Sequence, residues 1–557
     1  MAPSLLTVLR VRLVGVAAVL APVFAFTAAA LPGQGGLPPV PVPPGNPITP
    51  AKTVLGKILF WEEQMSSDNR VACGTCHLPE FGGGDGRRVP HPGLDGVQPS
   101  PDDTFGSPGT VRSDAANDYL PDPLFGTRAQ VTGRASPSFL NAAWFQQMFW
   151  DGRATPVFTD PVSGQVALTA NAALESQAVG PVVSSVEMAH DQRAWAQVTT
   201  KLQGAHPMAL ATNVPPDMAA AIAANPTYPQ LFAAAFGDPA ITAARIGMAL
   251  ATYERSLVAD QTPWDRFQRG DTAALTPQQF GGMNVFNGPG RCNLCHTPPL
   301  FSDGTFRNLG LRPIAQDDGR QSVTNNPADR GRFKVPSLRN SGLRTSFMHT
   351  GQFTSLQQVM GFYNGGAGPN LNNKDPLLVP LGLPPQALNN LAQFVSVGLT
   401  DPRVAARQFP FDRPTLASER IPPQGLVYGT GSPGSGGILP EMLAAVPANV
   451  GNTEFRIGVA GGLGGAPAAL VVSATQAPPG TQFLGINVHI GVPELFAVFL
   501  PLQGAPGAVG AGFGTFHVTL PDDPGLVGAV LFAQWLVSDG GAIGGASSSR
   551  GAMVQFL

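Results

Sequence analysis

All four cysteines of the chain lie in two C-x-x-C-H motifs, and this spacing limits what the chain can bind. The motifs are CGTCH and CNLCH, with residues Cys73, Cys76 and His77 in the first and Cys292, Cys295 and His296 in the second. Two sulfurs at this spacing can each form a thioether bond with one vinyl group of the same haem, and the following histidine can place a nitrogen on the iron. Each motif therefore predicts one covalently attached c-type haem.

Disulfides, a redox-active cysteine pair and a zinc site are the alternatives. A redox pair needs no histidine, and a zinc site usually brings its second cysteine pair within a few tens of residues. These two motifs are more than two hundred residues apart, and each has its own histidine. Two haems explain more of the pattern than any alternative.

The N-terminal residues have the pattern of a secretory signal peptide. Two arginines precede an apolar run from Leu13 to Phe26, and Ala28 and Ala30 then give the A-x-A pattern of a signal-peptidase site. A membrane anchor is the alternative, but the run is short and contains a proline. We expect a signal peptide at residues 1–30, export to the periplasm or cell surface, and no membrane span in the mature chain.

The composition and apolar spacing of the 557-residue chain indicate its class and its domains. A net charge of -3 gives no basic surface of the kind that nucleic-acid binding needs. Apolar residues at helical spacing, such as Ile246, Leu250, Tyr253 and Leu257, predict helices on either side of the second motif. We expect a Pro-rich linker at 31–50, a first haem domain at 51–270, a second at 271–415, a Gly/Pro linker at 416–440 and a further domain at 441–557.

The last of these segments differs in character from the others. Residues 421–557 contain no cysteine, no lysine and only two arginines, and their short apolar runs, such as FRIGVA and LFAVFL, are separated by turn residues. This pattern predicts a small antiparallel β-sandwich. The fold class expected for the whole chain is mainly α, with two cytochrome c-like haem domains followed by an all-β domain. Because this tail lacks the residue types used at the haems, we expect it to be dispensable for the chemistry.

Residues 51–415 resemble the bacterial dihaem cytochrome c peroxidase and MauG family. The resemblance depends on several motifs in order, which are LGKILFWEEQMSSDNRVACGTCH, RASPSFLNAAWFQQMFWDGRA, GPVVSSVEM and GRFKVPSLRNSGLRTSFMHTGQF followed by VMGFYNGG. It implies that the first haem reacts with hydrogen peroxide and that the second receives electrons and passes them on.

The resemblance also implies roles for single residues. Glu187, in SVEM, matches the acid-base residue beside the peroxide-binding iron, and Gln177 matches an amide that hydrogen-bonds the bound oxygen. Trp150, in FWDGR, matches a tryptophan that carries electrons between the haems. His91 follows the first motif at a spacing unlike that of the family's loop histidine, so ligation of the first iron, a haem-propionate contact and a solvent-facing side chain all stay open.

Two further positions depend on the same resemblance. The family holds calcium with an asparagine and backbone carbonyls, but this chain has Ala135 at the asparagine position and Arg344-Thr345-Ser346 at the turn, which weakens the prediction of calcium. The distal ligand of the second iron falls fourteen residues after the histidine of FMHTG, and from His349 this count gives Tyr363 rather than Met360. We therefore expect Tyr363 to be the ligand, on a helix that begins with a capping box in TSLQ and ends near Gly365.

These expectations favour an exported dihaem peroxidase that reduces hydrogen peroxide to water. Its electrons would come from a small redox protein, a cytochrome c or a cupredoxin, and would enter at the second haem. The alternatives are a MauG-like oxidase, which uses high-valent iron on a protein or organic substrate, and an electron carrier or surface-attachment protein. The resemblance is also compatible with a homodimer.

Overall fold

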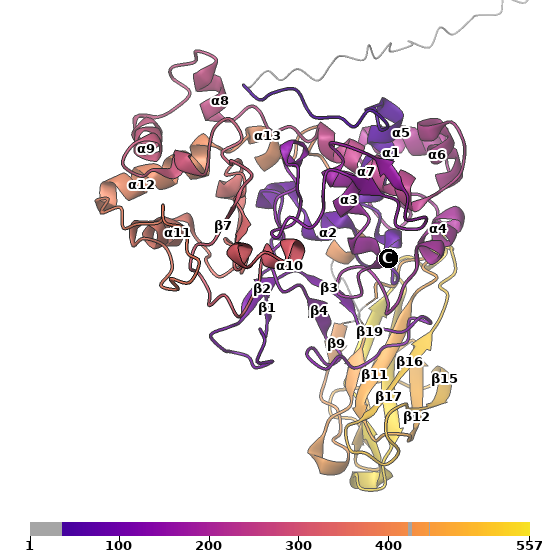
Figure 1. The fold of residues 1–557 in the computed structure, drawn as a ribbon. Helices are drawn as coiled ribbons and strands as arrows, with labels where there is room; N and C mark the ends of the chain where they lie inside the picture. Colours follow the sequence, from indigo (N-terminus) through magenta and orange to yellow (C-terminus); the bar gives the residue numbers. More distant parts are fainter. Residues whose placement is uncertain (1–35, 421–425, 445) are drawn as a thin grey trace, which may run out of the picture.

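The computed structural model describes residues 36–420, 426–444 and 446–557 and contains a helical part and a C-terminal β-region (Figure 1). The expected signal peptide lies outside the described residues. Within the described ranges, no helix is long and apolar enough to cross a membrane.

The first helical core surrounds the first C-x-x-C-H motif. Helix α1, Pro50–Phe60, begins at the N-cap Thr49, whose side chain accepts a hydrogen bond from the backbone nitrogen of Lys52. It crosses α7, Ala243–Ser256, so closely that a Cβ on Gly56 would lie 1.9 Å from the carbonyl oxygen of Ala249. The other helices of this part are α2 Cys73–Cys76, α3 Ala173–Ala178, α4 Trp195–Gly204, α5 Pro216–Ala224 and α6 Tyr228–Phe236.

The second helical core surrounds the second motif and also contains a close helix crossing at a glycine. A Cβ on Gly282, in α9, would lie 2.0 Å from the carbonyl oxygen of Asn390, in α12. Glycine thus permits a close helix crossing in both cores. The helices of this part are α8 Pro263–Gln268, α9 Pro277–Asn287, α10 Gln321–Thr324, α11 Leu356–Asn364 and α12 Pro385–Gln393, and the short helix α13 Pro402–Ala405 follows them.

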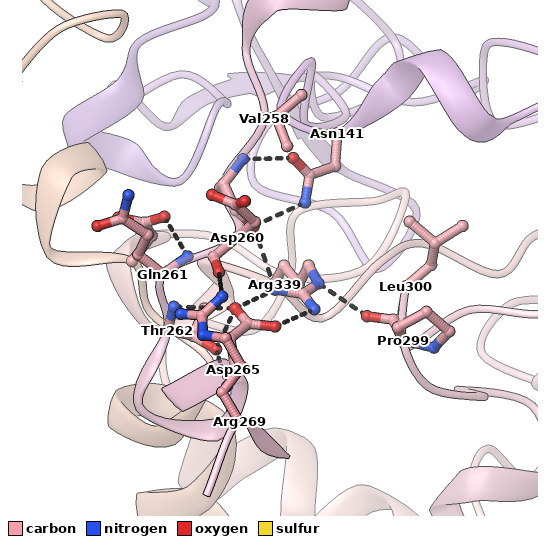
Figure 2. Close-up of polar contacts among 12 residues, drawn as sticks. Asn141, Val258, Asp260, Gln261, Thr262, Asp265, Arg269, Pro299, Leu300 and Arg339 are labelled. Carbon is pink, nitrogen blue, oxygen red and sulfur yellow. Dashed lines mark hydrogen bonds and ion pairs between the residues drawn. The ribbon is translucent and has the colours of Figure 1, made fainter. Parts of the chain in front are cut away.

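A buried ion pair ties the second helical core to the segment that connects it with the first (Figure 2). The guanidinium of Arg339 donates to both carboxylate oxygens of Asp265 at 2.7 and 2.8 Å, and both side chains are almost fully buried. Arg339 also donates to the carbonyl oxygens of Ala259 (3.1 Å) and Pro299 (2.8 Å). Because Pro299 follows the second motif by three residues, this network fixes that motif against the connection between the cores.

Residues 36–49, which belong to the Pro-rich segment expected as a linker, lie against the first core. Leu37 is buried, and the carbonyl oxygen of Pro38 accepts a hydrogen bond from Nε1 of Trp144 at 3.1 Å. The buried Asn46 donates from Nδ2 to the carboxylate of Glu175 at 2.9 Å. Residues 36–49 are therefore part of the first core rather than a linker, because their carbonyls and side chains form hydrogen bonds with it.

The end of the second helical segment returns to the first core, which moves the expected boundary at residue 415. Val404, Phe411 and Leu416 belong to the first apolar cluster. The carboxylate of the buried Glu63 accepts hydrogen bonds from the backbone nitrogens of Ala417 (2.7 Å) and Ser418 (3.0 Å). Residues from about 401 to 420 thus complete the first core rather than the second.

The C-terminal β-region consists mainly of two antiparallel sheets. One has the order β15-β12-β17-β19-β9, with β18 beside β17, and the other has the order β10-β11-β16. Leu470 and Trp535 from the larger sheet and Ile457 and Val459 from the smaller one lie in one buried apolar cluster. The strands are β9 Leu426–Tyr428, β10 Glu441–Leu443, β11 Arg456–Gly462, β12 Pro467–Ser473, β13 Gln482–Phe483, β14 Ile486–Asn487, β15 Glu494–Pro501, β16 Gly512–His517, β17 Val530–Ser538, β18 Ala546–Ser548 and β19 Gly551–Gln555.

Strand β9 corrects the expected linker at 416–440. Its backbone pairs with β19 in the register Ala552↔Val427, so the β-region begins well before residue 441. Residues 421–425 lie outside the described part of the chain.

The helical part also contains eight short strands in two-stranded sheets, and β1 to β4 lie on its side towards the β-region (Figure 1). The eight strands are β1 Val89–His91, β2 Thr104–Gly106, β3 Pro108–Val111, β4 Ala129–Val131, β5 Phe158–Thr159, β6 Val166–Leu168, β7 Phe306–Arg307 and β8 Phe333–Lys334. They pair in sequence order, β1 with β2 through β7 with β8.

Candidate active site

Each C-x-x-C-H motif lines its own cavity. The first cavity, of about 540 Å³, is lined by Cys73, Cys76 and His77, and the second, of about 220 Å³, by Cys292, Cys295 and His296. The four cysteines form no disulfide. The structure therefore brings together each predicted set of two sulfurs and one imidazole, and it separates the two sets.

The two histidines have matching hydrogen bonds that prepare them for a metal. Nδ1 of His77 lies 3.2 Å from the carbonyl oxygen of Gly83, and Nδ1 of His296 lies 3.0 Å from that of Phe301. A carbonyl oxygen can only accept a hydrogen bond, so Nδ1 must carry the hydrogen and donate it, and the lone pair of Nε2 is left for a metal. Burial lowers the pKa of both rings, which favours the neutral form that binds iron. The residues of both cavities thus fit a haem.

Acidic and amide side chains mark the first cavity. Glu187, after the turn Pro181–Val183, and Gln177, in α3, both line it. Burial raises the pKa of Glu187, while the Ser184 side chain and the charge of Arg153 act in the opposite direction. A carboxyl group whose pKa is raised by burial takes up a proton more readily than an exposed one, which suits a role in proton transfer.

Glu254 is a second carboxyl group in this cavity, and the sequence did not indicate it. It lies in α7, is 7% exposed, and its Oε2 has no hydrogen-bond partner among the described residues. Burial raises its pKa to about 8. The apolar spacing that includes Tyr253 and Leu257 predicted only a packed helix. An acidic residue, Glu254, between these apolar positions was the only sequence signal of a further role.

Trp150 lies between the two cavities and lines both. Its Nε1 donates to the carbonyl oxygen of Ala135 at 2.7 Å, and its own carbonyl accepts from the backbone nitrogen of Lys334 at 2.7 Å. Lys334 also lines both cavities, and burial lowers its pKa to about 8. The indole ring is therefore fixed at the boundary between the two sites.

Helix α11 presents both candidate ligands to the second cavity. Met360 and Tyr363 both line it, Met360 buried and Tyr363 half-buried. Burial and the nearby thiols of Cys292 and Cys295 raise the pKa of Tyr363. The N-cap of this helix is Ser355, which forms the capping box with Gln358, so the box lies one residue later than expected.

Two other predicted positions lie apart from this chemistry. His91 lines neither cavity, and its Nδ1 accepts a hydrogen bond from the backbone nitrogen of Gly93 at 3.1 Å. At the turn considered for calcium, the carbonyl oxygens of Ser136 (2.8 Å) and Ser346 (3.2 Å) accept hydrogen bonds from the guanidinium of Arg344. These oxygens already have a cationic partner from the chain itself.

Comparisons with known proteins agree with this arrangement. The family model for di-haem cytochrome c peroxidase matches residues 50–273. Cytochrome-c peroxidase IdrP1 of Pseudomonas sp. (strain SCT) is 30% identical over 436 residues, which cover 72% of this chain and 94% of that protein. The methylamine utilization protein MauG of Methylorubrum extorquens is 31% identical over 336 residues, which cover 59% of this chain and 72% of that protein.

A solved structure supports the fold of the helical part. The crystal structure of a MauG-like protein associated with microbial copper homeostasis aligns with a TM-score of 0.50 at 24% identity and covers 68% of this chain and 97% of that one. The extent of the match to cytochrome-c peroxidase IdrP1, together with two cavities that each fit a haem, assigns the family. The chain belongs to the di-haem cytochrome c peroxidase family of oxidoreductases.

Proposed function

We propose that the protein reduces hydrogen peroxide to water at the first cavity, with electrons that enter at the second. The observation that carries this proposal is the unequal lining of the cavities. Glu187 and Glu254, two carboxyl groups whose pKa is raised by burial, line the first cavity. The carboxyl groups that line the second, Asp317 and Asp375, are ion-paired with Arg134 and Arg307, and Met360 and Tyr363 lie in the same lining. Trp150 contacts both.

The four cysteines would hold two haems covalently, and His77 and His296 would be the iron ligands. When bound, the haem of the first cavity supplies the redox chemistry that cleaves the peroxide oxygen–oxygen bond. The overall reaction consumes one hydrogen peroxide, two electrons and two protons and gives two waters. The chain itself must therefore bind peroxide, move its proton and conduct the electrons.

Glu187 is the residue that we assign to the proton. As a carboxylate, it takes the proton from one peroxide oxygen and gives it to the departing oxygen, so that the leaving group is water. Gln177, on the same cavity wall, can hold a peroxide oxygen by a hydrogen bond from its amide. Since burial raises the pKa of Glu187, its carboxylate takes up a proton more readily than that of an exposed glutamate.

Trp150 is the residue that we assign to the electrons. It forms part of both cavity walls, and the hydrogen bond to Ala135 fixes its ring plane. An aromatic side chain at this position divides a long electron transfer into two shorter ones. The donor would be a small redox protein, a cytochrome c or a cupredoxin, and the expected site of action is the periplasm or the cell surface.

A MauG-like oxidase is the second candidate, and Tyr363 is the observation that favours it. A phenolate is a hard, anionic ligand that favours oxidised iron, whereas the thioether of Met360 is soft and favours ferrous iron. Tyr363 on the second iron would help the protein to keep oxidising power for a protein or organic substrate. Relatives named as MauG are 28% and 31% identical to this chain.

Stoichiometry distinguishes the two functions. The holoprotein is mixed with peroxide and a reduced cytochrome c, and both oxidised cytochrome and remaining peroxide are measured. The peroxidase predicts sustained turnover with two cytochromes oxidised for each peroxide consumed. Peroxide consumption that needs an organic or protein substrate, and is unaffected by the cytochrome, would instead establish the oxidase.

A further inference from the structure

The hairpin of β3 and β4 holds the segment that carries Glu187. Oγ1 of Thr110, in β3, lies within hydrogen-bond distance of the carbonyl oxygens of Ser185 (3.0 Å) and Ala189 (3.2 Å). Gln130, in β4, donates from Nε2 to the same Ser185 oxygen at 2.7 Å. Thr110 and Gln130 are both buried, so these bonds are shielded from water. They fix the backbone on both sides of Glu187.

Steric contact adds to these hydrogen bonds. A Cβ on Gly109 would lie 2.0 Å from the carbonyl oxygen of Val186 and 2.8 Å from the Cα of Glu187, so no side chain fits between β3 and this backbone. Further along, the backbone nitrogen of Asp191 donates to the carbonyl oxygen of Ser113 at 2.8 Å. A displacement of the hairpin must therefore displace the Glu187 segment.

The other end of the hairpin is buried against β11 and β16. Tyr119 is 1% exposed, and its backbone nitrogen donates to Oγ1 of Thr515 at 2.9 Å. Its ring lies against Gly458, where a Cβ would be 2.5 Å from a ring carbon. The guanidinium of Arg456, which is fully buried, lies 4.2 Å from the ring centroid and donates to the carbonyl oxygen of Asn117.

Polar pairs extend this contact along the hairpin tip. Nε2 of His517 lies 2.9 Å from a carboxylate oxygen of Asp118, and Oγ1 of Thr127 donates to the carboxylate of Glu441 at 2.8 Å. Val111 and Tyr119 also share a buried apolar cluster with Leu443 and Ala460 of the β-region. The contact is thus continuous from the apolar centre to the polar edge.

We propose that the C-terminal β-region is a brace for the first cavity, which holds Glu187 in position through the β3–β4 hairpin. A two-stranded hairpin is marginally stable alone, so its geometry depends on what it packs against. A catalytic carboxylate needs its place fixed to a fraction of an ångström. The catalytic part of this inference rests on the role proposed above for Glu187, whereas the mechanical part can be measured separately.

Hydrogen–deuterium exchange of the full-length holoprotein measures the mechanical part. The backbone nitrogens of Glu187, Met188 and Ala189 all donate to the carbonyl oxygen of Ser184, so their exchange reports the opening of this turn. We expect Tyr119→Ala to accelerate this exchange about tenfold or more and to slow the peroxide reaction without loss of either haem. Thr515→Val, which removes one hydrogen bond at the same contact, should shift both measurements in the same direction by less.

Two variants serve as controls. Tyr119→Phe keeps the ring, and the Tyr119 hydroxyl has no hydrogen-bond partner among the described residues, so this variant should behave as the wild type. Trp535→Phe weakens the core of the β-region away from the hairpin, and its Nε1 likewise lacks a described partner. It should leave the Glu187 turn unchanged.

The outcomes separate the brace from the function. Unchanged exchange in both Tyr119→Ala and Thr515→Val, or equal acceleration in Trp535→Phe, would overturn the brace. Faster exchange with an unchanged peroxide rate would confirm the mechanical contact and overturn the role proposed for Glu187.

Discussion

The two cavities are each lined by a C-x-x-C-H motif, but most of their other lining residues differ in chemistry. Both have two thiols and a histidine whose Nδ1 bonds to a carbonyl. The first adds Glu187 and Glu254 from two separate segments, and burial raises the pKa of both. The second adds a helix with a thioether and a phenol, and its carboxyl groups, Asp317 and Asp375, are ion-paired with arginines. The motif thus fixes where a haem can be attached, and the residues that reach the opposite wall decide what it can do. The predictions below test this division of roles.

Removal of one attachment site should have the largest effect. Replacement of Cys73 and Cys76 by serine should leave a protein with one haem that no longer turns over peroxide, because no thioether bond can form. The corresponding change at Cys292 and Cys295 should also leave one haem, but the first site should still react with peroxide once. Mass spectrometry counts the haems, and rapid mixing follows the reaction. Equal loss of the single reaction in both variants would show that the cavities do not divide the roles.

Glu187→Gln should keep both haems and lower peroxide turnover by about a hundredfold or more, the scale of positioned acid-base catalysis. The amide has nearly the same shape but cannot take up the proton. Glu494→Gln, at an exposed position in β15, is the control for loss of a carboxyl group elsewhere. If peroxide turnover in the Glu187 variant equals that of the control, Glu187 is not the acid-base residue.

Trp150→Phe should slow electron transfer between the haems several-fold and leave haem content unchanged. The expected signature is a first haem that is oxidised by peroxide at the normal rate and a second that responds late. Trp144→Phe is a matched control, because Trp144 also donates to a backbone carbonyl, that of Pro38, but lines neither cavity. A second haem that keeps pace in both variants would place the electron route elsewhere.

Tyr363→Phe and Met360→Leu distinguish the two candidate ligands of the second iron. We expect the ferric spectrum and the reduction potential of the second haem to change in the Tyr363 variant and to stay unaltered in the Met360 variant. Both side chains line the cavity, so each substitution disturbs its packing. A difference between the two variants in spectrum or potential therefore reports which side chain coordinates the iron. The reverse result would assign the thioether as the ligand.

The pH dependence of the peroxide reaction should show the smallest effect. The carboxylate of Glu187 accepts the proton, so the rate should fall as pH decreases through its pKa. Because burial raises that pKa, the midpoint should lie above the value of about 4.3 for an exposed glutamate. Glu187→Gln should abolish this limb of the profile. A midpoint at the exposed value would show that the carboxyl group is open to solvent.

The sequence by itself determined the two C-x-x-C-H motifs that predict haem attachment, the helices near them and the β character of the tail. These features depend on patterns within a few residues, such as the two positions between paired cysteines or the short apolar runs of β11 and β15 between turn residues. Local spacing also predicted the helix of Met360 and Tyr363, with its capping box misplaced by one residue.

Only the tertiary structure decided which distant residues share a wall. Glu254 faces the first cavity because α7 crosses α1, and the segment after residue 401 completes the first core. The tail, which the sequence made look separable, is tied to the Glu187 segment through Tyr119. No local sequence pattern predicts these contacts, because they join residues that are far apart in the sequence and form only when the chain is packed.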